Sequence, residues 1–314
     1  MIYLDYSANT PVDPAVLEVF LHTETTYHGN PNSSHPAGLA AREKLKETTE
    51  SIADLLHIQP SEVIYTSGAS EANNLAIKGI ARTQRNYGRH IISTALEHPS
   101  VSGPLTWLQE QGYEIDLADI RRDEIPFSFS GVDTASMAAH KFYGLNGSGM
   151  LFKRNSLVLD PLIHGGSGAS LYRSGTPTLG LATALESALR LSVEQLPERY
   201  ERAAVLNQKL RDALSRYACV RINSPKEAVP HILNLSVSGV KGIKMQQILS
   251  EHGVCVSVKS ACSTEGTPSK AVFAVSRDRK NALSSWRISL SHKTTDDEIR
   301  EFLEIFGQCI KELA

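Results

Sequence analysis

The chain has few cysteines and no segment that would place it in a membrane. Its four cysteines, among 314 residues, have spacings that fit no zinc site. No apolar run approaches the length of a membrane span. The first residues also lack the basic and apolar regions of a signal peptide. We therefore expect a cytoplasmic protein with no metal site, no membrane contact and, at this size, no disulfide framework.

An excess of charge of either sign is also absent. The net charge is −2 and the pI is about 6.6, so nothing indicates a surface for nucleic acid. Hydrophobic residues make up 41% of the chain. That is enough for a large core and favours two domains.

The first half of the chain alternates helix and strand patterns, with Asp13 and Pro14 as the N-cap and first position of the first helix. Such repeats predict a mostly parallel sheet with helices on both faces, an α/β fold. The expected elements are helix 14–25, helix 37–57, strand 62–66, helix 71–83, strand 89–94, helix 101–111 and strand 113–117.

The second half predicts a smaller α+β domain after two long helices, with Pro197 near the boundary. We expect a large domain over 13–195 and a small domain over 1–12 and 196–314. Thr295 and Glu298 form a capping box that starts the last helix. The other expected elements are helices 177–194 and 197–217, strands 219–222 and 231–237, helix 242–252, and strands 254–258 and 285–290.

Lys141 follows His140 where a strand meets a Gly-rich turn, after the small residues of 134–138. We expect these surroundings to desolvate the lysine. Desolvation lowers the pKa of an amine and makes it available as the nucleophile that forms a Schiff base. The alternative is a lysine that extends from the strand end into solvent.

Two further loops follow predicted strands. The stretch Thr66–Glu71 opens a helix with small residues, which suits either an anion-binding helix start or an ordinary tight turn. His98 follows the next strand, and the carboxyl ends of parallel strands meet at one edge of a sheet. We expect His98 on the same rim as Ser70, with an ordinary loop histidine as the alternative.

Two residues of the second half stand out. Cys262 lies in a polar loop beside Lys259, a setting that favours a thiolate, whereas Cys219, Cys255 and Cys309 are interpreted as structural. Arg287 lies inside an apolar strand and needs a carboxylate or phosphate partner, unless it forms an internal salt bridge. Together these features suit pyridoxal phosphate chemistry on an amino acid, with an added thiol nucleophile.

The chain closely resembles the cysteine desulfurases, which belong to the class V aminotransferase group of fold-type I pyridoxal phosphate enzymes. The resemblance runs nearly end to end. It is carried by Tyr3–Pro11, Gly29–Pro31, Thr66–Glu71, Asn74–Ala76, Glu97–His98, His140–Lys141, Tyr143–Gly144, Arg173–Thr176, Ser260–Cys262 and Arg287.

The resemblance implies how the cofactor is held. Lys141 would link pyridoxal 5′-phosphate covalently and move protons at the substrate Cα, and His98 would stack on the pyridine ring. The phosphate would be held by Ala69, Ser70 and His140, and by Thr176 from a neighbouring subunit, which implies a homodimer.

The resemblance also implies the substrate and the partners. Arg287 would bind the carboxylate of L-cysteine, and Cys262 would take its sulfur as a persulfide while alanine is released. A mobile loop around Cys262 would pass the sulfur to an acceptor protein of iron–sulfur assembly or tRNA thiolation.

The sequence departs from this family in two places. Ala138 stands where the family usually has a serine that contacts the phosphate. Several dozen residues are also missing near 119–126, among them the aspartate that pairs with the pyridine nitrogen. We therefore expect an irregular join there and apolar strand edges left uncovered.

Three functions stay open at this point. The first is a cysteine desulfurase. The second is another pyridoxal phosphate lyase or transaminase of this fold, in which Cys262 is incidental. The third is a truncated, inactive relative that acts only as a binding scaffold.

Overall fold

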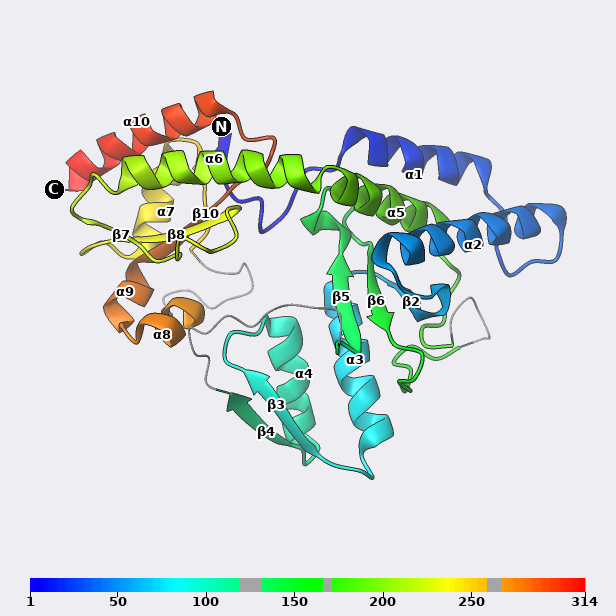
Figure 1. Ribbon diagram of the computed structural model, residues 1–314. Helices are drawn as coiled ribbons and strands as arrows, with labels where there is room; N and C mark the ends of the chain where they lie inside the picture. The colour runs from blue at the N-terminus through cyan, green and yellow to red at the C-terminus, as the bar shows by residue number, and fades with distance from the viewer. Residues whose placement is uncertain (119–130, 166–170, 259–266, 314) are drawn as a thin grey trace. The chain divides into compact units, whose positions relative to one another are not determined.

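The structure is a computed structural model that describes residues 1–118, 131–165, 171–258 and 267–313 (Figure 1). The chain divides into two compact units, which are described separately. The large unit contains Thr10–Ala118 and the later stretch that ends at Glu194. The small unit contains Met1–Asn9 and Gln195–Ala314. No helix of the described residues is long and apolar enough to cross a membrane.

The main sheet of the large unit has three strands in the order β2-β6-β5. They are β2 (Val63–Thr66), β6 (Gly149–Lys153) and β5 (Thr134–Ala138). The middle strand β6 is antiparallel to both neighbours. As a result, β2 and β5 run parallel to each other and end at the same edge of the sheet.

Helices cover both faces of this sheet. On one face lie α2 (Pro36–Leu56) and α5 (Leu179–Glu194), and on the other lies α3 (Ala69–Gln84). The remaining helices of the large unit are α1 (Pro14–Thr26), which packs on α5, and α4 (Pro99–Glu110), which packs on α3. Met150 and Phe152 of β6 share a core cluster with residues of α2 and α5. Leu151 points the other way, because side chains alternate along a strand, and packs with residues of α3. The strand β6 is therefore buried along its whole length.

A second, separate sheet pairs β3 (His90–Thr94) with β4 (Glu114–Ala118) in parallel. The predicted parallel sheet of the first half would place strand 113–117 beside the segment that leads to Lys141. In the part of the chain that the structure describes this is wrong, since β4 and β5 belong to different sheets. Additional parallel strands would require crossover connections of a dozen or more residues each, and the chain is too short for them between β4 and β5. The predicted join at 119–126 itself lies outside the described residues.

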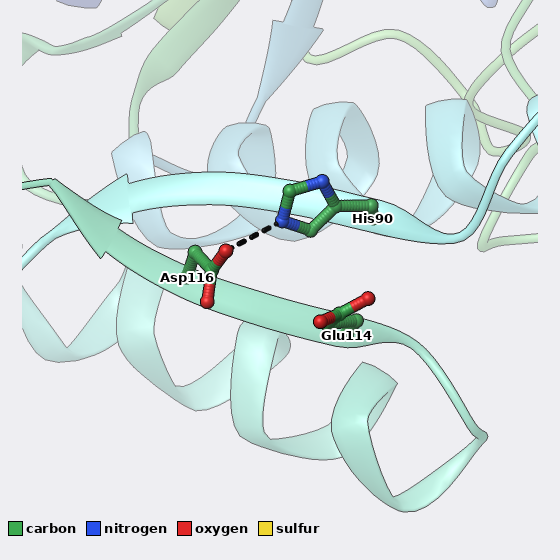
Figure 2. A group of neighbouring side chains, drawn as sticks. All are labelled: His90, Glu114 and Asp116. Carbon is green, nitrogen blue, oxygen red and sulfur yellow. Dashed lines mark hydrogen bonds and ion pairs between the residues drawn. The ribbon is translucent and has the colours of Figure 1, made fainter.

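Among the described residues one face of the β3–β4 pair is exposed, and Figure 2 shows the polar side chains that it carries, while α4 contacts β4. His90, Glu114 and Asp116 are exposed there, and His90 Nε2 lies 2.9 Å from Asp116 Oδ2. These three are the one group of potential metal ligands in the described ranges. Ile92 lies on the same strand and is 68% exposed, and Leu117 of β4 is 61% exposed. Apolar side chains of this pair are thus left in solvent, as expected for a sheet without its interior strands.

The small unit has its own core. Its antiparallel sheet has the order β10-β8-β7, and β1 pairs with β9 in parallel. Trp286, Phe302 and Phe306 are fully buried in the core cluster of this unit. The strands are β1 (Ile2–Tyr3), β7 (Val220–Ile222), β8 (Ile232–Val237), β9 (Val254–Cys255) and β10 (Ser285–Ser289).

Most predicted elements of the small unit are present. The helices are α6 (Leu196–Leu214), α7 (Gly242–Glu251), α8 (Lys270–Ser276), α9 (Arg279–Ser284) and α10 (Asp296–Leu313). The capping box is confirmed, because Thr295 N donates to Glu298 Oε2 at 2.8 Å and Glu298 N donates to Thr295 Oγ1 at 3.1 Å. The short helices α8 and α9 were not predicted, and β9 is shorter than the expected strand 254–258.

Gly149 is required where β6 begins. An added Cβ would lie 2.5 Å from Gly68 Cα and 2.5 Å from the Met137 carbonyl oxygen. Because both contacts are with backbone, we expect Gly149→Ala to lower the free energy of unfolding by about 1–3 kcal/mol. Urea denaturation measures this. Gly88→Ala is the control, since no atom lies within 4 Å of its added Cβ. Equal stability of both variants would contradict this packing.

Candidate active site

Two loops meet at one edge of the main sheet. The register aligns Thr66, Gly149 and Ala138 across β2, β6 and β5. From Thr66 the chain turns into α3, and from Ala138 it enters the short helix η2 (Ala139–Lys141). With one strand between them, these two exits lie about 10 Å apart. The predicted anion loop and Lys141 therefore lie on the same rim.

The start of α3 is open to an anion. Gly68 is its N-cap, with φ 148°, and gives no side-chain cap. No atom lies within 4 Å of the place where a Cβ of Gly68 would be. The amide groups of the first turn, those of Ala69 and Ser70 among them, therefore have no capping side chain, and the helix dipole favours negative charge there. The Ser70 side chain is exposed beside them.

Glu71 fixes the shape of this loop. Its Oε2 accepts from Ser67 N at 2.8 Å, and its Oε1 accepts from Arg173 Nε at 3.0 Å. Burial alone would raise the pKa of the Glu71 carboxyl, but the hydrogen bonds from Ser67 and the pairing with Arg173 outweigh it and hold the pKa below its ordinary value. Glu71 is therefore an anionic anchor that joins Arg173 to the start of α3.

The expected desolvation of Lys141 is wrong for the described residues, because its side chain is exposed. The strand before it, β5, has a neighbour on one side only in the described sheet. No second adjacent strand covers the end where Lys141 lies. His140 is half-buried, and burial together with the nearby Lys141 charge lowers its pKa.

Thr10 holds the Lys141 turn in place, a role that the sequence did not reveal. Its buried hydroxyl donates to the His140 carbonyl oxygen at 2.9 Å and accepts from Tyr143 N at 2.8 Å. Thr10 N also donates to the His140 carbonyl, at 2.9 Å. Tyr143 has φ 68°, a left-handed conformation that is costly for a side chain of this size. These bonds secure an unfavourable backbone around Lys141.

His98 is linked to α3 through a short chain of hydrogen bonds. It is the N-cap of α4, and its Nδ1 accepts from Ser100 N at 3.1 Å. The same ring nitrogen lies 2.9 Å from Ser100 Oγ, which in turn accepts from Asn73 Nδ2 at 2.8 Å. Asn73 lies three residues after Ser70 in the same helix. The exposed imidazole is therefore tied to the helix whose start forms the anion loop.

The other predicted residues lie elsewhere. Thr176 is exposed in the segment that follows Arg173. Cys262 lies outside the described residues. Cys309 is buried, whereas Cys219 and Cys255 are half-buried. Arg287 belongs to the small unit, where its Nη2 lies 2.9 Å from Asp5 Oδ1, so the salt bridge that we left open as an alternative is present.

Asp133 does not lie on the rim of Lys141 and the anion loop. Asp133 is the nearest before Lys141 in the sequence, but it precedes β5 while Lys141 follows it. The strand separates them by roughly 15 Å. Asp133 lies instead near Arg154, with 3.5 Å between the carboxylate and Nε. Asp119 and Asp123 lie outside the described residues.

The groups on this rim suit the phosphate and the aldehyde carbon of a phosphorylated aldehyde. Uncapped amides and the Ser70 hydroxyl suit its phosphate. The exposed amine of Lys141 suits its carbonyl carbon. Asp133 lies at the other end of β5 and pairs with Arg154, so it does not supply a partner for the ring nitrogen.

Comparison with known proteins shows the family to which the chain belongs. A family model described as "Aminotransferase class-V" matches residues 2–126 and 118–302. The two matches meet at 118–126, where the sequence predicted a missing segment.

The relatives are longer than this chain in the interior. "Cysteine desulfurase IscS" of Vibrio cholerae serotype O1 is 32% identical over 378 residues, 99% of this chain and 93% of that protein. "NifS/IcsS protein homolog" of Lactobacillus delbrueckii subsp. bulgaricus is 28% identical over 372 residues, 98% of this chain and 97% of that protein. Both compared stretches exceed the 314 residues of this chain. The relatives therefore carry internal residues that this chain lacks.

Solved structures confirm the fold class. A structure titled "NIFS-LIKE PROTEIN" has a TM-score of 0.89 and 27% identity, and covers 99% of both chains. A structure titled "SspA in complex with cysteine" has a TM-score of 0.78 and 26% identity, and covers 94% of this chain and 100% of its own.

Thr10→Val should destabilise the Lys141 turn. The isosteric change removes the hydroxyl and leaves the buried Tyr143 N–H without that acceptor, so we expect the free energy of unfolding to fall by about 1–3 kcal/mol. Urea denaturation measures this. Thr25→Val is the control, because that hydroxyl is exposed and bonds only within its helix. A Thr10→Val variant as stable as the control would show that the hydrogen bonds of the Thr10 hydroxyl do not stabilise the Lys141 turn.

The charge of Lys141 should also control His140. In the cofactor-free protein, Lys141→Gln removes a nearby positive charge, so the pKa of His140 should rise toward its ordinary value of 6.5. Burial should still keep it below that value. Proton NMR titration of the imidazole measures the shift, with His140→Gln for assignment and Lys44→Gln as the control. An unchanged pKa would show that the two side chains do not interact.

Proposed function

The chain belongs to the aminotransferase class-V family, and we propose that it is a pyridoxal phosphate-dependent cysteine desulfurase. It would convert L-cysteine to L-alanine and carry the sulfur on Cys262. The relatives named above support the general reaction. A cysteine complex among the similar structures supports the substrate.

One observation of the structure carries this proposal. The register of β2, β6 and β5 brings the uncapped start of α3 and the turn of Lys141 to one rim. An anion-binding helix start and a primary amine on one rim suit a cofactor with a phosphate and an aldehyde.

Each residue of the large unit has a distinct task in this proposal. The amides of Ala69 and Ser70, with the Ser70 hydroxyl and His140, hold the phosphate. Lys141 binds the aldehyde carbon and moves the proton at the substrate Cα. His98 stacks on the ring, and its hydrogen bonds with Ser100 fix the ring plane. When bound, the cofactor supplies an electron sink for the Cα carbanion.

The sulfur step needs the small unit. Arg287 binds the substrate carboxylate, and the thiolate of Cys262 attacks the sulfur of the bound cysteine. A sulfur–sulfur bond forms while the carbon–sulfur bond breaks, and the substrate carbon takes a proton. The products are alanine and a Cys262 persulfide, so that atoms and electrons balance without any added oxidant.

We also propose a cytoplasmic homodimer that delivers the persulfide sulfur to an acceptor protein of iron–sulfur assembly or tRNA thiolation. Thr176 would complete the phosphate site of the other subunit. It is exposed, close in sequence to the Arg173–Glu71 pair that anchors its segment. Its side chain is thus available to a second copy.

The absence of a sequence counterpart for the aspartate that pairs with the ring nitrogen determines the turnover rate that we expect. A carboxylate at that nitrogen keeps the pyridinium protonated, which makes the ring a strong electron sink. The sequence lacks the segment that carries this carboxylate in the family, and Asp133 pairs with Arg154 instead. We therefore expect slow turnover.

Incubation of the cofactor-loaded protein with L-cysteine should yield alanine and an equal amount of sulfane sulfur, absent from a Lys141→Ala blank. Cys262→Ser should still bind the cofactor but accumulate no persulfide, because the attacking thiolate is gone. Mass spectrometry of the intact chain and amino acid analysis measure both products. Cys255→Ser is the matched control and should keep the activity. Equal losses in Cys262→Ser and Cys255→Ser would refute the assignment of the nucleophile.

The same experiment separates the alternative functions. Pyruvate, or transfer of the amino group to a keto acid, in place of alanine would indicate another lyase or a transaminase of this fold. A protein that forms no borohydride-trappable link to pyridoxal phosphate would be a binding scaffold.

A further inference from the structure

Arg287 is held by a chain of contacts within the small unit. Its Nη2 donates to Asp5 Oδ1 at 2.9 Å, and Asp5 Oδ2 accepts from Ser257 Oγ at 2.7 Å. Ser257 is in turn fixed to Arg287 by the backbone, because Arg287 N donates to the Ser257 carbonyl at 2.6 Å and Ser257 N donates to the Arg287 carbonyl at 3.2 Å. Three distant parts of the sequence thus form a closed loop of hydrogen bonds.

This loop uses one of the five N–H groups of the guanidinium and leaves a buried one without a partner. Arg287 Nε is buried and has no hydrogen-bond partner among the described residues. The side chains of Arg287 and Asp5 are only 20% and 18% exposed. A buried N–H without an acceptor is costly, so the orientation of this guanidinium depends on the contacts that Asp5 and Ser257 supply.

The neighbouring Tyr3 does not supply that acceptor. Its hydroxyl donates to the Asn9 carbonyl at 2.9 Å and to the Asp5 carbonyl at 3.2 Å. Burial, and then the charges of Asp5 and Cys255, raise the pKa of Tyr3. The phenol therefore stays neutral, and Asp5 is the anion that pairs with Arg287.

We infer that Asp5 is a positioning residue: it holds Nη2 of the Arg287 guanidinium and thereby fixes the plane in which the remaining N–H groups meet the α-carboxylate of the amino acid substrate. The guanidinium is planar, and its five N–H groups point in fixed directions. Fixing Nη2 therefore fixes the direction of the other N–H groups. This inference rests on the proposed function, which gives Arg287 its carboxylate.

A competing role for Asp5 predicts the opposite result. If Asp5 merely occupied the carboxylate site until substrate arrived, its removal would tighten substrate binding. If Asp5 positions Arg287, its removal weakens binding, because the freed guanidinium must be ordered again in each complex. The sign of the change in affinity decides between the two.

The test compares Asp5→Asn with the wild type, both loaded with cofactor. We expect the KM for L-cysteine to rise about tenfold while kcat changes less than about twofold, because binding is affected more than chemistry. Ser257→Ala keeps the charge of Asp5 but frees its second oxygen, and should raise KM by a smaller factor, with Ser257→Thr restoring it. Asp297→Asn is the matched control, because it removes an exposed ion pair with Arg300 in the same unit.

A second measurement needs no turnover. Calorimetric titration with L-alanine, which carries the same carboxylate and no sulfur, should give about tenfold weaker binding for Asp5→Asn than for the wild type. Unchanged or tighter binding, or a wild type that does not bind L-alanine, would overturn the inference. A wild type that binds L-alanine but makes none from L-cysteine would refute the proposed function and leave the role of Asp5 standing. If Asp5→Asn does not fold, the KM values of Ser257→Ala and Ser257→Thr test whether Asp5 positions Arg287.

Discussion

The antiparallel placement of β6 between β2 and β5 is the constraint on which the site depends. It lets two parallel strands end at one edge, with Gly149 between Thr66 and Ala138. Gly149 has no side chain, so β6 can lie directly against Gly68, where α3 begins. Hydrophobic burial on both faces of β6 secures this arrangement. The anion loop and the lysine turn are thus placed by the core of the large unit.

The sheets of the large unit lack strand neighbours in the described residues. Among these residues β5 has one neighbour, and the β3–β4 pair stands apart with an exposed face (Figure 2). Exposed Ile92 and exposed Lys141 share this cause, because neither has the sheet neighbour that would cover it. The family match breaks at 118–126, between β4 and β5. A single internal loss accounts for both the split sheet and the exposed lysine in the described residues.

The small unit handles its charges differently. Its buried arginine is paired with Asp5, and Asp5 is paired with Ser257. A buried guanidinium without a carboxylate would be strongly destabilising. The pairing stabilises the fold, while the buried Nε–H has no partner among the described residues. By the inference above, the same ion pair also orients the guanidinium.

The sequence by itself determined the class of fold, most helices and strands, and the chemical types of the site residues. Hydrophobic periodicity, the Asp13 N-cap and the Thr295 capping box are local signals, and local hydrogen bonds bear them out. Only the tertiary structure decided the contacts that join distant residues. Thr10 lies 130 residues before His140 and Asp5 lies 282 before Arg287. No spacing within a helix or strand predicts such pairs. The exposure of Lys141 was also decided there, because burial depends on which strands lie beside a residue and not on its neighbours in the chain.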